Sequence, residues 1–409
     1  MANSYPAEIQ VAFEKVLEEF DKEAPLSGNV LKYNPDPKQM HREGDETWLP
    51  QPMIETVGDG IDTTGITNDT QRLVVPCSLG QVKHVVADFD SLELRDDNSL
   101  DGWVEASKQA LSAAVETAIA QRVAMTGAHV ITRPGPLTGY DDLSLCEASL
   151  TEIGVPSGMR YMALNTRDKI GVASNLAARQ TINGKPTDAM EESYIGRFAK
   201  FSTYDADVLP RIPATDAVGV TVNGAGQAHV PVASIETADG AKRNVDNRYY
   251  NLTVSDTSDI KPGDAFTIDG VNRVHLITKE DTAQPFVFRV RNIVSSTVIE
   301  VTAAIADGKY KNVTAAPADL AALDFINVAT TQSNIFWHKN SVKLISGNLA
   351  VDKMKDLSPV MGRTEKSGIQ IIMLKESNID RVDMRFKFLM FFDVTNMNPL
   401  MNGILLANQ

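Results

Sequence analysis

One segment, residues 99–126, constrains the fold more than any other, because it predicts a single long helix. The segment is rich in Ala and lacks Pro, with Gly102 near its start and Gly127 at its end, as helix ends prefer. Apolar residues recur at helical spacing and define one face, which we expect to be buried. That face consists of Leu111, Val115, Ala118 and Met125, with Val104, Ile119 and Val123 beside it. Such a helix would be about 40 Å long. Taken alone, the pattern fits an ordinary long core helix equally well.

Residues 215–330 differ from the rest of the chain and are predicted to be all β. In residues 286–291 the alternation places Phe and Val side chains on one face, and Arg289 and Arg291 on the other. Turn dipeptides separate these short strands at frequent intervals, which favours a small barrel or sandwich. Because mixed helix and strand patterns resume at residues 334–337, we interpret the segment as an insertion.

Residues 24–80 contain many Pro and Gly residues that interrupt any long helix. They predict an extended arm followed by a two-stranded loop, and so long a loop usually has a functional reason. An arm that packs on a neighbouring subunit would supply one. Residues 6–22 have the apolar spacing of a short amphipathic helix. Further strands are predicted at residues 129–132, 218–222, 297–302, 342–345, 369–374 and 384–394.

Composition limits the function of the 409-residue chain. It has 39 basic and 53 acidic residues, hence a net charge of −14, and no run of basic residues. Nucleic-acid binders need clustered Lys and Arg, so this balance argues against a DNA-reading module, although not against a protein that encloses DNA. The two cysteines, Cys77 and Cys146, form no disulfide framework, which fits a reducing cytoplasm. The sequence shows neither a secretory signal nor an apolar run of about 20 residues, so no membrane partner is expected.

The sequence contains no recognisable motif for catalysis, cofactor binding or metal binding. Its six His residues are isolated and lack metal-binding spacing. The glycine pairs at 58–60 and 224–226 approach a dinucleotide fingerprint but lack the third Gly, so we interpret both as turns. We therefore expect no catalytic residue, no cofactor and no metal, and this expectation favours a structural role.

Several separate stretches occur in an order and at spacings that point to a known family. They are Thr47-Trp48-Leu49-Pro50, Leu94-Arg95-Asp96-Asp97, Val130-Ile131-Thr132, Asn244-Val245-Asp246-Asn247-Arg248, Lys261-Pro262-Gly263-Asp264 and Asn334-Ile335-Phe336-Trp337. With them the chain resembles the coat proteins of short-tailed phages of the P22 type, which are major capsid proteins with the Hong Kong 97 fold and an inserted domain. The match runs from about residue 40 to about residue 350 and fades after Leu349.

The resemblance implies an α+β fold with the family's order of domains. These would be an N-terminal arm (1–45), an E-loop (46–82), a P-domain (83–150) with its spine helix at 99–126, part of the A-domain (151–214), an inserted six-stranded β-barrel or I-domain (215–330), and return segments to the A- and P-domains (331–409).

The resemblance also implies a function in assembly. Copies of the chain would form pentamers and hexamers by head-to-tail contacts. A scaffolding protein would guide them into a procapsid in the host bacterial cytoplasm, DNA would enter through a portal protein, and the shell would then expand. The shell would enclose double-stranded DNA without binding it sequence-specifically. The alternatives are a cellular shell protein of the encapsulin kind, an α/β hydrolase without a recognisable motif, and a tail or baseplate protein.

One loop of the insertion is a candidate contact site between subunits. Residues 236–243 are polar, with the turn dipeptide Asp239-Gly240 at the tip. In the family this region resembles the loop that reaches across a twofold axis between capsomers. Opposite charges on one loop would suit a self-complementary contact, and they are Glu236, Asp239, Lys242 and Arg243. The alternative is a solvated hairpin tip.

Overall fold

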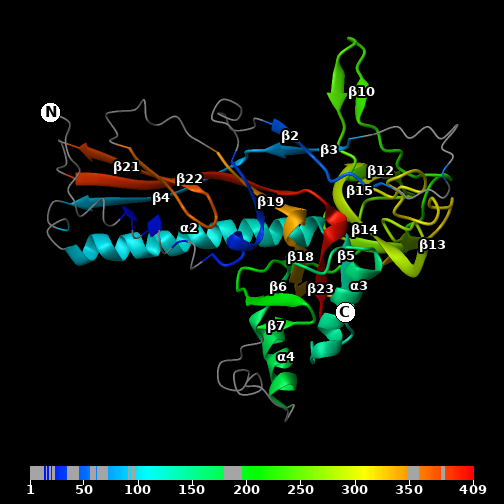
Figure 1. The fold of residues 1–409 in the computed structure, drawn as a ribbon, viewed down its shortest axis with the longest axis horizontal. Helices are drawn as coiled ribbons and strands as arrows, with labels where there is room; N and C mark the ends of the chain where they lie inside the picture. Colours follow the sequence, from blue (N-terminus) through cyan, green and yellow to red (C-terminus); the bar gives the residue numbers. More distant parts are fainter. Residues whose placement is uncertain are drawn as a thin grey trace. The chain divides into compact units, whose positions relative to one another are not determined.

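The structure is a computed structural model (Figure 1). It describes residues 13–14, 16–17, 20, 24–34, 46–55, 61, 72–90, 93, 97–178, 196–347, 359–378 and 383–409. The chain forms two compact units, each assembled from separate stretches. The first comprises Met1–Thr47, Cys77–Ala120 and Val342–Thr395, and the second Trp48–Pro76, Gln121–Ser341 and Asn396–Gln409.

The first unit is a six-stranded sheet against which the N-terminal part of helix α2 (Asp97–Thr126) packs. The strand order is β1-β19-β22-β21-β20, and β4 pairs with β22 as well. These strands are β1 (Leu31–Tyr33), β4 (Gln81–Asp90), β19 (Val342–Ser346), β20 (Val360–Arg363), β21 (Gln370–Asn378) and β22 (Asp383–Asn396).

Aromatic side chains hold helix and sheet together in this unit. The Trp103 ring of α2 stacks on Phe388 of β22 with ring centroids 4.9 Å apart, and meets Phe89 of β4 edge to face at 5.9 Å. Such pairs contribute beyond the area that they bury. Strand β22 is apolar and buried on both faces over residues 388–392, which is the pattern of a covered central strand, whereas polar Arg385 and Lys387 alternate with apolar residues nearer its start.

The second unit is built on another six-stranded sheet, in the order β5-β23-β18-β6-β8-β7. Its strands are β5 (His129–Thr132), β6 (Arg160–Leu164), β7 (Arg197–Phe198), β8 (Phe201–Asp205), β18 (Asn334–His338) and β23 (Asn402–Leu406). Helix α4 (Thr166–Ala178) connects β6 to the parallel strand β8, as in a βαβ unit. The core of this part also includes apolar residues of α3 (Tyr140–Glu152).

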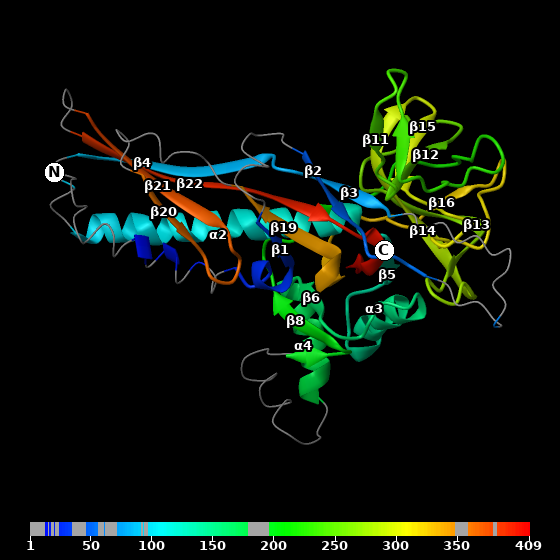
Figure 2. The ribbon, with the colours of Figure 1, turned by 45° about the horizontal axis from the view of Figure 1, so that its top comes forward.

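Along the chain, a separate β domain lies between β9 (Arg211–Ile212) and β17 (Thr331–Gln332). Figure 2 labels the strands of its main sheet, β12 to β16. Its sheet has the order β12-β15-β14-β13-β16. These strands are β12 (Tyr249–Thr253), β13 (Ala265–Val274), β14 (Asp281–Ser295), β15 (Val298–Thr302) and β16 (Leu323–Phe325). A single core of 17 buried apolar residues fills the domain.

Two residues close this sheet. Thr221 bridges to Ala322 beside β16, and Val222 bridges to Val254 at the end of β12, so the segment joins the two outer strands of the order. The sequence predicted a full strand at 218–222 and the resemblance implied six strands. The main sheet of the domain instead has five strands and this pair of bridges, because Gly219 and Gly224 have positive φ angles on either side and limit the extended stretch.

The chain enters and leaves the β domain at one point, which we call the neck. The Thr215 N–H donates to the Asn327 carbonyl at 2.9 Å, and the Asn327 amide group donates to the Pro213 carbonyl at 3.0 Å. Fully buried Asp264 accepts from the Asn327 amide group at 2.9 Å and from the Thr215 hydroxyl at 3.2 Å. Strands β9 and β17, on the far side of the neck, pair with each other.

The remaining described elements are short. Strands β2 (Glu46–Pro50) and β3 (Val74–Ser78) pair with each other, in the region predicted as a two-stranded loop. The 3₁₀ helices are η1 (Ser27–Asn29), η3 (Lys339–Ser341) and η6 (Pro399–Met401). Of the predicted N-terminal helix, residues 13, 14, 16, 17 and 20 are helical, and its other residues lie outside the described ones. The glycine pair at 58–60 lies outside them as well.

Candidate functional site

The predicted contact loop is an exposed hairpin that projects from the β domain (Figure 1). Strand β10 (Ser234–Glu236) and strand β11 (Lys242–Asn244) pair with each other in a sheet of their own. All six of their residues are exposed, and so is Asp239 in the turn between them. The four charged residues of the prediction therefore lie together on one exposed hairpin.

The register of the hairpin sorts these charges onto two faces. Glu236 lies opposite Lys242, and Ile235 lies opposite Arg243. Because neighbouring residues on a strand point to opposite faces, Arg243 and half-exposed Ile235 share the face away from the Glu236–Lys242 pair. The sequence pattern indicated the charges but not this division.

Local hydrogen bonds shape the turn. The Thr237 N–H donates to the Ala241 carbonyl at 2.9 Å and the Gly240 N–H to the Thr237 carbonyl at 2.8 Å. Gly240 has a φ of +78°, which side-chain-bearing residues rarely adopt. The Thr237 hydroxyl donates to the Asp239 carboxylate and lowers the pKa of Asp239 below its ordinary value, so this carboxylate is charged at neutral pH.

The predicted core face of α2 is buried in part. Leu111 and Val115 are 1% and 0% exposed, whereas Ala118 and Met125 are half-buried. Also buried are the residues that the sequence pattern placed beside this face, Val104, Ile119 and Val123. The Met125 thioether lies against Gly263, where a Cβ atom would come within 2.8 Å of it.

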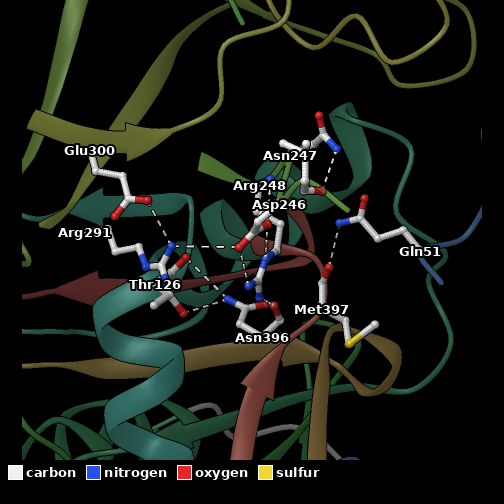
Figure 3. A network of polar contacts seen from close by, with 10 residues as sticks. Gln51, Thr126, Asp246, Asn247, Arg248, Arg291, Glu300, Asn396 and Met397 are labelled. Atoms are coloured by element: carbon white, nitrogen blue, oxygen red, sulfur yellow. Dashed lines mark hydrogen bonds and ion pairs between the residues drawn. The ribbon is translucent and has the colours of Figure 1, made fainter. Parts of the chain in front are cut away.

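A polar network that the sequence pattern did not predict joins the β domain to the C-terminal end of α2 (Figure 3). Arg248 donates from Nε and Nη2 to the two oxygens of Asp246, at 2.9 and 2.7 Å, and from Nη1 to the Asn396 carbonyl. The Asn396 amide group in turn donates to the Thr126 hydroxyl at 2.8 Å. Arg291 lies over the Tyr249 ring, 4.4 Å from its centroid, at the edge of the same network.

Charge and burial are balanced in this network. Burial would raise the pKa of Asp246, but the hydrogen bonds and the charge of Arg248 outweigh it and hold this pKa below its ordinary value. Bidentate Arg–carboxylate pairs are among the stronger side-chain hydrogen bonds. Asp246 and Arg248 are therefore a charged, mutually satisfied pair at the base of the β domain.

A second arginine of the β domain caps α2. The last turn of α2 carries no basic residue of its own, and its terminal carbonyl groups need partners. Arg289 on β14 is 1% exposed and donates from Nη2 to the Ala124 carbonyl of that turn. A cation favours the negative end of a helix dipole. The sequence placed Arg289 on the face opposite the apolar one; the structure buries it, because the end of α2 covers that face of β14.

A third cluster surrounds the buried imidazole of His129 on β5. Its Nε2 lies 2.9 Å from the Leu400 carbonyl, while its Nδ1 lies 2.6 Å from the Ser149 hydroxyl and 2.8 Å from Nη1 of Arg273 on β13. Because the arginine only donates, Nδ1 accepts and Nε2 carries the hydrogen. Burial first, and then the charge of Arg273, lower the pKa of His129 to about 3, so the imidazole is neutral.

We expect His129 to make the folded subunit acid-sensitive. Its pKa is about 3 when folded and near 6.5 when unfolded, so between these values the unfolded chain binds one proton more. The free energy of unfolding should therefore fall as pH decreases through this window, by up to about 1.4 kcal/mol per pH unit from this group. Urea unfolding of His129→Asn between pH 7 and 4 should show a shallower dependence than the wild type. His84→Asn, exposed on β4, should follow the wild type, and parallel curves for His129→Asn and the wild type would contradict the assignment.

Among the described residues, no group of three or more His, Cys, Asp or Glu side chains is placed to hold a metal ion. In that same part of the chain, no helix combines the length and apolar character needed to cross a bilayer. Cys77 and Cys146 are both buried, and neither is part of a disulfide.

Comparison with known proteins identifies the family. The family model described as "P22 coat protein - gene protein 5" matches residues 1–407. Similar solved structures include the capsid of cyanophage P-SCSP1u, with 9% identity, a TM-score of 0.46, and 93% of this chain and 88% of that chain covered. A structure from Mycobacterium phage Che8 has 10% identity, a TM-score of 0.41, and coverages of 89% and 85%. The CUS-3 coat protein I-domain is 40% identical over 26% of this chain and 95% of its own, with a TM-score of 0.21.

The family match over nearly the whole length defines the class of the protein, which is a major capsid protein of a tailed phage. The chain belongs to the P22 coat protein family. As a capsid protein, it associates with copies of itself into the shell of a virion that encloses DNA. The predicted α+β fold class is confirmed by the described helices and strands, and the arrangement is consistent with the Hong Kong 97 fold.

Proposed function

We propose that this coat protein assembles with a scaffolding protein into a procapsid in the host cytoplasm, receives DNA through a portal protein, and then expands. The observation that supports this most directly is the family match over residues 1–407. The acidic net charge of −14 fits a shell that encloses double-stranded DNA without sequence-specific binding. Its role is structural rather than catalytic.

The domain layout is part of this proposal. Residues 1–45 are the N-terminal arm, 46–82 the E-loop, 83–150 the P-domain, 151–214 part of the A-domain, 215–330 the I-domain, and 331–409 the return segments. The neck at residues 213–215 and 327 supports the I-domain limits, because both chain crossings meet there.

Assembly itself can be tested by expressing the chain with and without the scaffolding protein of the same phage. With scaffold, electron microscopy should show closed shells of uniform size. Without it, we expect capsomers or irregular particles. Small discrete monomers under both conditions, at high protein concentration, would contradict the proposal of scaffolded assembly.

The hairpin of β10 and β11 is the proposed contact across the twofold axis between capsomers. Its exposed, oppositely charged residues let each charge meet its counterpart on a second copy. Asp239 is held in the charged form, and Arg243 lies on the face that also carries Ile235. A single exposed ion pair contributes little, but the contact repeats throughout a shell.

We expect Asp239→Lys, and equally Arg243→Glu, to leave the subunit folded but to reduce the yield or stability of correct shells. The double variant restores the charge balance and should recover them. Circular dichroism checks folding, and electron microscopy at low and high salt checks assembly, since screening weakens such contacts.

The control is Asp307→Lys, at an exposed position elsewhere in the β domain, which should assemble normally. Normal shells from both single hairpin variants at low salt would leave only the alternative of a solvated hairpin tip.

A further inference from the structure

The hairpin of β10 and β11 has little lateral support. It forms a two-stranded sheet of its own, and the residues of both strands are exposed. An isolated two-stranded hairpin is marginally stable in water. The direction in which it points therefore depends on how its two legs are held where they leave the β domain.

One buried side chain holds both legs. Asn247 is 5% exposed, and its Nδ2 donates to the Val232 carbonyl at 2.9 Å and to the Val245 carbonyl at 3.0 Å. Its Oδ1 accepts from the Val232 N–H at 2.9 Å and lies 3.0 Å from Nε2 of His229. Val232 precedes β10 and Val245 follows β11, so Asn247 clamps the hairpin at its base.

The residues on either side of Asn247 anchor this clamp to the rest of the second unit. Asp246 bridges to Val74 of β3, and Arg248, paired with Asp246, donates to the Asn396 carbonyl. Asn396 is bonded to Thr126 at the end of α2, as Figure 3 shows. A continuous path of contacts thus runs from the hairpin base to the helix end.

We propose that Asp246, Asn247 and Arg248 are positioning residues that set the direction of the hairpin relative to α2. The inference rests on the proposed twofold contact, because a correctly directed hairpin is what allows two copies to meet. Asn247 and Arg248 are buried and Asp246 is half-buried, so the three residues offer little surface to a partner. They act through the hairpin, and their loss should affect its direction before it affects the fold of the β domain.

The test measures direction in the unassembled subunit. Cysteines introduced at Ala238, beside the hairpin tip, and at Gln121, exposed on α2, carry spin labels, while the two native cysteines are buried. Pulsed electron paramagnetic resonance measures the distance between the two labels. It should give one narrow distance distribution for the chain that carries no other change. Asn247→Ala should widen it at least twofold. The matched control Asn244→Ala, exposed on β11 and outside the clamp, should leave the width unchanged.

A lowered melting temperature with an unchanged distance distribution in Asn247→Ala would overturn the proposal, because the residue would then be merely structural. If Asn247→Ala is insoluble, Asn247→Ser is measured instead, since a serine hydroxyl is too short to span both legs. Insolubility of both variants would also overturn the proposal, by making the residue a folding requirement.

The yield of closed shells from the same variants distinguishes the positioning role of these residues from the proposed twofold contact of the hairpin. A widened distribution together with a severalfold loss of closed shells supports both. A widened distribution with a normal yield of shells supports the positioning role and refutes the twofold contact of the hairpin.

Discussion

Replacement of Val115 by Asp is expected to give protein that collects in the insoluble fraction. Val115 is 0% exposed, one helical turn from Leu111, which is 1% exposed on the same face of α2. Burying a carboxylate there without a partner costs several kcal/mol or forces it to take up a proton. The total stability of a domain is only about 5–15 kcal/mol, so this single change removes much of it. Fractionation of cell lysates after expression measures the outcome.

Ala113→Asp is the matched control, because it places the same charge at an exposed position two residues earlier on α2. It should remain soluble and assemble. Soluble, assembling Val115→Asp would mean that this face of the helix is accessible in the assembling subunit, against the burial described above.

The second large effect is expected at the neck of the β domain. Asp264 is 0% exposed and accepts hydrogen bonds from the Lys261 N–H at 2.9 Å, the Thr215 hydroxyl and the Asn327 amide group. Asp264→Ala leaves these donors without their acceptor. Each donor that stays buried and unpaired lowers the stability of the fold by about 1–3 kcal/mol. We expect the free energy of unfolding to fall by about 3–5 kcal/mol in urea titrations, and proteases to cut the chain faster near residues 213–215 and 327.

Asp269→Ala provides the comparison, since Asp269 lies on the same strand, β13, but is exposed. It should change stability by less than about 0.5 kcal/mol. Equal, small effects of the two substitutions would show that the neck does not depend on the buried carboxylate.

The parts of the fold that sequence analysis predicted well are those with strong local periodicity. The helix predicted at 99–126 is α2 at Asp97–Thr126, and the strand predicted after it is β5 at His129–Thr132. Both follow from side-chain spacing within a few turns or residues. The strand predicted at 218–222 is shorter in the structure, where only Thr221 and Val222 form bridges. Its length depends on distant pairing partners and on the flanking glycines, which local spacing does not describe.

The candidate site shows the same limit. The hairpin was found because Asp239-Gly240 is a local turn signal between charged residues. Asp246, Asn247 and Arg248 appeared in the sequence only as part of a family-like stretch. Arg248 binds a carbonyl 148 positions further along the chain, and Arg289 one 165 positions earlier. Alternation on β14 placed Arg289 on the face opposite the apolar one but did not predict its burial, because local spacing carries no information about which distant element covers a strand.

The neck also explains how a chain can carry so large an insertion without disturbing the fold around it. Ile212 pairs with Thr331, and Arg211 with Gln332, as the two strands of an antiparallel hairpin would. The β domain therefore occupies the position of a hairpin's turn. Because the entropic cost of closing a loop grows only slowly with its length, the host strands pair almost as readily around a whole domain as around a few residues. Such a connection lets a domain be acquired, lost or exchanged in evolution by a single event at one surface turn.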